Sequence, residues 1–105
     1  MMLITNMKYV YSMMYDDLKD ADMMAGYAEK TIENPEYSKY YQEEAQKRLT
    51  MFNSRHERFT RFVKEYKAAH PEHSSDNMCW KMSHEHYLDW YSSIKSKLDN
   101  LSKLY

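Results

Sequence analysis

The stretch from Pro35 to Ala69 constrains the fold of this chain more than any other feature. It contains no glycine, and its only proline is its first residue. Its apolar side chains recur at steps of four and three, which is typical of one buried stripe along an α-helix. At 1.5 Å per residue this helix would be roughly 50 Å long. It cannot bury the stripe against itself, so the rest of the chain has to cover it. The stripe consists of Ala45, Leu49, Phe52, His56, Phe59, Val63 and Tyr66.

The rest of the chain predicts two further helices. One glycine and two prolines in 105 residues favour few, long elements. Asn34-Pro35 and His70-Pro71 are the clearest breaks, because proline disfavours the helical conformation at the preceding residue. Short connections favour antiparallel neighbours. We therefore predict an all-α fold in a single domain over 1–105, with three long antiparallel helices in an elongated up-down-up bundle. The predicted helices cover about 7–33, 36–69 and 76–104, and Asn6 is the expected N-cap of the first.

The first predicted helix carries small residues on its apolar stripe. Ala21, Ala25 and Ala28 would let a neighbouring helix approach closely, and the stripe ends at Ile32. Gly26 also lies inside this helix, where glycine costs ~1 kcal/mol relative to alanine. Either another helix packs against Gly26, or the glycine is merely tolerated.

Charge and hydropathy limit the classes of partner. The chain has 15 Lys and Arg and 16 Asp and Glu, and this balance argues against general binding to nucleic acid or to anionic membranes. No apolar run reaches the 18 residues expected of a membrane span. The segment MMLITN is too short for a signal sequence, and one cysteine excludes an internal disulfide framework. We expect a cytoplasmic protein, in the host cell cytoplasm if a phage encodes it.

Catalytic patterns are not found in the sequence, and we predict that the protein is not an enzyme. One glycine does not provide a glycine-rich phosphate loop, and no His–carboxylate pair can be placed beside Cys79. His56 lies on the stripe of the long helix, level with Tyr91, and we interpret it as a core residue. His70, His73 and Cys79 form a weaker alternative, a zinc site around the second connection.

The aspartates of the first helix and the arginines of the second should lie level with one another. Asp20 is expected opposite Arg48. Two interpretations remain open. The charges form ion pairs between the helices, worth ~0–1 kcal/mol each when exposed, or the arginines face outward toward an acidic partner or a phosphate. The residues concerned are Asp16, Asp17, Asp20 and Asp22, and Arg48, Arg55, Arg58 and Arg61.

Three stretches, LKDADMMAGYAEKT, YYQEEAQKRLTMFNSRH and MSHEHYLDWYSSIKSKL, resemble small phage- and prophage-encoded helical proteins of ferritin-like type. The resemblance implies a metal pair held by a Glu on one helix and Glu-x-x-His motifs on others. The second helix offers Glu44-x-x-Lys47, and Leu88 stands where the histidine after Glu85 belongs. We therefore expect the fold without the metal pair and without a cofactor. The residues left for a metal-binding alternative are Asp22, Glu44, His56, His84 and Glu85.

The abundance of tyrosine and methionine favours protein binding. The chain has 11 Tyr and 10 Met, which form adaptable contact surfaces. We predict a non-enzymatic interaction module of phage or mobile-element origin that blocks a host defence or regulatory protein or assembles into homo-oligomers. Alternatives are a ferritin-like metal-binding protein, a virion structural or accessory component, and, least favoured, a nucleic-acid mimic or binder. The predicted contact residues are Tyr37, Tyr40, Arg55, Arg58, Arg61 and Trp90, with Tyr11, Tyr15 and Tyr27 as further candidates.

Overall fold

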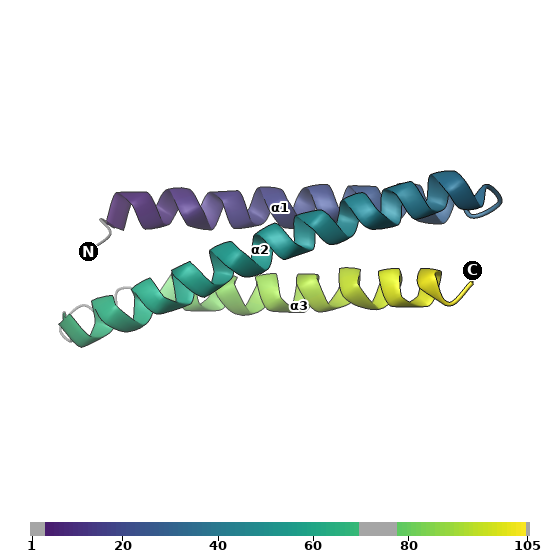
Figure 1. The fold of residues 1–105 in the computed structure, drawn as a ribbon. Helices are drawn as coiled ribbons and strands as arrows, with labels where there is room; N and C mark the ends of the chain where they lie inside the picture. The colour runs from purple at the N-terminus through teal and green to yellow at the C-terminus, as the bar shows by residue number, and fades with distance from the viewer. Residues whose placement is uncertain (1–3, 70–77, 105) are drawn as a thin grey trace.

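The computed structural model describes the backbone of residues 4–69 and 78–104, and the side chains of 9–66, 68–69 and 85–104. Its three α-helices are α1 (Ile4–Lys30), α2 (Pro35–Ala69) and α3 (Met78–Ser102). α1 and α3 run in the same direction, and α2 returns obliquely across them (Figure 1). The molecule measures 55 × 20 × 16 Å. The prediction of an elongated all-α bundle is confirmed.

Local hydrogen bonds set the ends of the helices. α2 begins at Pro35 and ends at Ala69, within one residue of the prediction. α1 extends to Ile4, so Asn6 lies inside it and the predicted N-cap is wrong. α1 also ends at Lys30 rather than at 33, because two of the amides that follow bond three residues back instead of four: Ile32 donates to the Glu29 carbonyl at 3.4 Å and Asn34 to the Thr31 carbonyl at 2.8 Å. α3 likewise ends at Ser102, before the predicted 104.

Small residues line the contact between α1 and α2. The alanines of α1 and Ala45 of α2 are completely buried, so the two backbones approach closely. Ser38 is also buried, and its hydroxyl donates to the carbonyl of Ala28 at 2.9 Å. That carbonyl belongs to the last turn of α1, where backbone acceptors lack partners within the helix. Gln42 donates to the same Ser38 hydroxyl at 3.1 Å, so a short polar chain fixes the turn. The buried alanines are Ala21, Ala25, Ala28 and Ala45.

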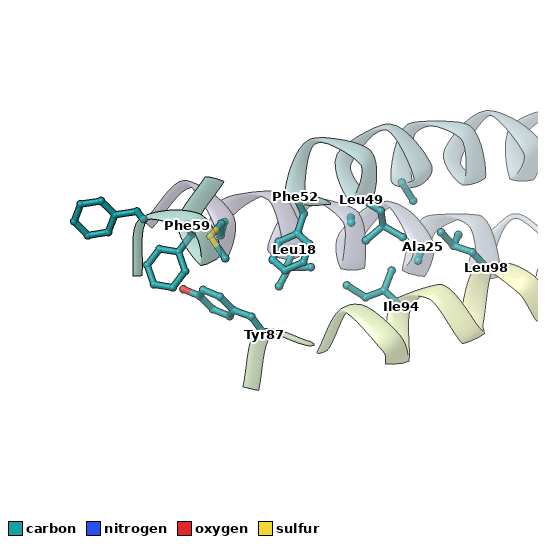
Figure 2. Close-up of a cluster of buried hydrophobic side chains, with 12 residues drawn as sticks. Leu18, Ala25, Leu49, Phe52, Phe59, Tyr87, Ile94 and Leu98 are labelled. Carbon is teal, nitrogen blue, oxygen red and sulfur yellow. The ribbon is translucent and has the colours of Figure 1, made fainter. Parts of the chain in front are cut away.

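Larger side chains fill the middle of the bundle, where α3 joins the pair. Leu18 and Phe52 lie together, and Ile94 and Tyr87 reach toward them from α3 (Figure 2). Phe52 stacks on His56 at 5.6 Å and on Tyr91 at 5.4 Å between ring centroids. Tyr91 therefore lies level with Phe52 and with Asn53, which donates to the Tyr91 hydroxyl at 3.1 Å, and the expected pairing of His56 with Tyr91 stays a prediction.

Polar contacts attach α3 mainly to α1. The indole Nε1 of Trp90 donates to Oδ2 of Asp22 at 3.0 Å, and Lys97 lies 3.2 Å from Glu29. The Tyr87 hydroxyl reaches the backbone carbonyl of Tyr11 at 3.4 Å. These contacts lie along one side of α1, so α3 covers one face of the α1–α2 pair.

Gly26 gives a direct test of packing around α1. A Cβ built on Gly26 meets nothing within 4 Å, and its backbone is helical. We expect Gly26→Ala to raise the free energy of unfolding by ~1 kcal/mol, because alanine loses less backbone entropy in a helix. Urea denaturation followed by circular dichroism measures this change. A lower stability would show that another chain or segment packs on Gly26 in solution.

Candidate protein-binding face

Three of the residues that the sequence predicts at a contact surface instead bond to or pack against other residues of the same chain. Nη1 of Arg55 lies 2.5 Å from Oδ1 and 2.6 Å from Oδ2 of Asp17. Trp90 bonds to Asp22, as described above, and packs against Tyr15. The Tyr11 ring lies against the rings of Phe59 and Tyr87 on the other two helices. We therefore assign these side chains to packing between helices.

The ion pair between Asp17 and Arg55 lies at the margin of the core. Only 6% of the Asp17 side chain and 20% of the Arg55 side chain are exposed. Burial raises the pKa of the Asp17 carboxyl above its ordinary value, and the Arg55 guanidinium opposes that shift. Of the two interpretations of the charged residues, ion pairing between helices holds for Arg55.

The side of α1 that faces away from α3 carries a second stripe. Residues two positions apart on a helix point to roughly opposite faces. The α1 residues that contact α3 are Tyr11, Tyr15, Asp22 and Glu29. The residues two positions before them are Tyr9, Met13, Asp20 and Tyr27. Asp16 falls on the same stripe, seven residues after Tyr9, and is exposed.

α2 has a matching second stripe. Asn53 of α2 donates to the Tyr91 hydroxyl on α3, and Met51 and Arg55, two residues away on either side, point away from α3. Steps of three and four from Met51 and Arg55 lead to tyrosines at one end and to Arg58 and Phe62 at the other. We call the combined surface of the two stripes the outer face. Its members are Tyr9, Met13, Asp16, Asp20, Tyr27, Tyr37, Tyr40, Met51 and Arg58, with Arg61 at its edge and the buried Phe62 beneath one of its hollows.

Exposed aromatic side chains are concentrated on the outer face. Tyr9 is 68% exposed, Tyr37 60% and Tyr40 56%, and these are the three most exposed aromatic residues that the structure describes. Near the α1–α2 turn, Tyr41 packs against Tyr27 at 5.4 Å and against Tyr40 at 5.3 Å between ring centroids. This end of the outer face is therefore a contiguous aromatic surface.

Two open hollows lie along the α2 part of the outer face, and Arg58 belongs to both. One is lined by Arg58, Arg61, Phe62 and Glu65. The other is lined by Thr50, Met51, Ser54, Arg55 and Arg58. Arg58 is exposed and forms no ion pair with a described residue, whereas Arg61 lies 3.8 Å from Glu57 of its own helix. An aromatic or acidic side chain would find apolar walls and a guanidinium at either hollow.

The alternative metal ligands do not come together in the part of the chain that the structure describes. Asp22 bonds to Trp90 on α3, Glu44 pairs with Lys47 of its own helix at 3.1 Å, and His56 stacks on Phe52. Glu85 is exposed on α3. Within the described ranges no three His, Cys, Asp or Glu side chains could hold one ion. The side chains of His84 and Cys79 and all of His70 and His73 lie outside the described residues.

Comparison with known proteins found no relative of this chain. No protein family, no curated protein and no solved structure matches the chain. Over the described residues, no helix is both long enough and apolar enough to cross a membrane. The candidate site is therefore defined by the geometry of the chain itself.

Sequence reasoning missed Tyr9 and Met51 as members of the candidate site. Tyr9 lies off the main stripe of α1, and Met51 lies off the main stripe of α2. The available signal was the second set of three- and four-residue steps on α2, which passes from Tyr37 through Met51 to Arg58. Tyr27, named from the sequence as a further candidate, does lie on the outer face.

Removing one partner of the buried ion pair should destabilise the fold. We expect Arg55→Met to lower the free energy of unfolding by about 3 kcal/mol, because it leaves the Asp17 carboxylate buried without its cation. The double variant Asp17→Leu, Arg55→Met should regain most of this loss, since neither charge remains. Chemical denaturation of the four proteins in this cycle measures the coupling. Additive single losses would contradict the pairing.

The same variant should show a characteristic pH dependence. The Asp17 pKa is raised in the folded protein, so its protonation favours folding at acid pH, and this contribution is lost as pH rises through the folded pKa. Without Arg55 the opposing effect disappears, and the folded pKa of Asp17 should rise further. The stability deficit of Arg55→Met relative to the parent should therefore shrink as pH is lowered from neutral. A deficit that is constant with pH would show that Asp17 keeps its charge without Arg55.

Proposed function

We propose that this protein is a non-enzymatic interaction module that binds another protein chain through the outer face. The observation that supports this most strongly is that the three most exposed of the described tyrosines, Tyr37 and Tyr40 near the turn and Tyr9 toward the other end, share one face with the two hollows around Arg58. Tyrosine and arginine carry a large share of the energy at protein interfaces. Large exposed apolar patches on a small domain are also costly unless they serve a contact.

The proposal retains four of the residues expected from the sequence and changes the role of two. Tyr37, Tyr40, Arg58 and Arg61 lie on the outer face or at its edge. Arg55 and Trp90 act within the chain. Phage or mobile-element origin, and action by blocking a host defence or regulatory protein, belong to the same proposal and rest on the sequence resemblance. Self-assembly is the other mode of action within it.

Site-specific cross-linking tests the proposed face. A photoreactive benzophenone amino acid replaces Tyr40 on the outer face or, as a matched control, Ser96, which is exposed on α3. On illumination in cells that produce the protein, position 40 should give defined protein adducts, identified by mass spectrometry, and these should be lost in the Arg58→Glu background. Equal adducts from position 96, or none from position 40, would contradict binding through the outer face.

A further inference from the structure

We propose that the occupant of the outer face is a second copy of this chain, related by a two-fold axis along the length of the bundle, so that α1 of each copy packs against α2 of the other. This inference rests on the proposed function, because it assigns a partner to the same face. The argument uses the charges of the two stripes and their relative positions along the bundle.

Unpaired charges of opposite sign lie on the two halves of the outer face. Asp16 and Asp20 of α1 form no ion pair with a described residue, and neither does Arg58 of α2. Among the described residues of the outer face, one chain thus presents two unpaired aspartates on α1 beside one unpaired arginine on α2, since Arg55 and Arg61 pair with Asp17 and Glu57. If two copies pack face to face, with α1 of each against α2 of the other, the aspartates of one copy meet the arginine of the other.

The positions of these charges along the long axis of the bundle, which we call their heights, agree with such a contact. The Asp17–Arg55 pair places Asp16 near the height of Arg55 along the bundle. Arg58 lies three residues further, which is about 4.5 Å on a helix and within reach of an arginine side chain. Rotation about an axis along the length of the bundle leaves the position of every residue along that axis unchanged. Asp16 of one copy therefore faces Arg58 of the other.

The same rotation brings the most exposed aromatic residue to a hollow. Tyr11 contacts Phe59 at 5.4 Å between ring centroids, so Tyr9 lies near the height of Arg61. Tyr9 of one copy then faces the hollow formed by Arg58, Arg61, Phe62 and Glu65 of the other. A tyrosine ring beside two guanidinium groups and a phenylalanine edge gains both apolar burial and cation–π attraction.

Two-fold symmetry favours a second copy over an unrelated acidic partner. Tyr9 and the aspartates of α1 lie on the same face of one chain as the hollows around Arg58 of α2. Two copies can therefore satisfy both sets of residues in a closed dimer. An unrelated acidic helix would satisfy only the α2 stripe and leave Asp16 and Asp20 beside another acidic surface. The four helices α1 and α2 of both copies would then form the centre of the dimer, with α3 on the outside of each half.

Charge exchange tests this arrangement in the purified full-length chain. Sedimentation and light scattering should show a dimer that weakens as salt increases. Arg58→Glu and Asp16→Arg should each raise the dimer dissociation constant at least about tenfold, because a like-charge contact occurs twice in each homodimer. An equimolar mixture of these two variants should again dimerise, because in the heterodimer both contacts join opposite charges. Lys64→Glu, an equal charge change on another side of α2, should leave dimerisation unchanged.

Each other outcome overturns part of the argument. A parent protein that stays monomeric at every concentration overturns the dimer, and adducts of position 40 with a different protein would still support the proposed function. A monomer without such adducts overturns both. A dimer that neither variant weakens uses another surface, and two weakened variants that fail to recover on mixing exclude the two-fold contact. Circular dichroism verifies folding, and Arg58→Gln with Asp16→Asn, which should weaken dimerisation less, replaces any variant that loses helix.

Discussion

The close approach of α1 and α2 is the constraint on which the rest of the structure depends. Buried alanines on both helices, with Ser38 at the turn, bring the backbones together at this end of the pair, where Leu49 is the large side chain buried in the same core. Toward the other end the core positions hold larger side chains, which are Met14, Phe52 and Phe59. Tyr87 and Ile94 of α3 fill the space beside them. α3 covers both regions, because Leu98 is buried in the same core near the alanines and Lys97 lies 3.2 Å from Glu29 in the last turn of α1, so the third helix completes the core along the pair.

A third helix can cover only one side of a helix pair. α3 attaches along Tyr11, Tyr15, Asp22 and Glu29 of α1, and the residues on the opposite side of α1 stay uncovered. In a four-helix bundle another helix would lie there. None of the three described helices lies there, and the uncovered positions carry tyrosine, methionine and arginine rather than a uniformly charged surface. The outer face is thus a consequence of the packing as well as of the composition.

The fold could be predicted from the sequence because its determinants are local. Asn34-Pro35 and the long glycine-free stretch fix α2 within one residue, and the spacing of apolar residues identifies the stripes. The end of α1 was missed because the amides of Ile32 and Asn34 bond three residues back, to Glu29 and Thr31, a choice that residue types alone do not decide. The site was predicted only in part for a related reason. Tyrosine, tryptophan and arginine indicate contacts, but Arg55 and Arg58, three residues apart, differ in whether an aspartate of α1 lies within reach.

The buried ion pair also links the interior to the outer face. If α2 slipped by one turn along α1, the Asp17 carboxylate would remain buried while Arg55 moved about 5.4 Å away, a change that costs about 3–5 kcal/mol for a buried charge left unpaired. The alanine contacts alone would resist that slip less, since Ala21, Ala25 and Ala28 present similar surfaces at successive turns. Asp17 and Arg55 therefore reinforce the register that the short turn and the bond from Ser38 to Ala28 set. That register sets the heights of Tyr9 and Asp16 relative to the hollows of α2, so the complementarity of the outer face depends in part on a pair that lies beneath it.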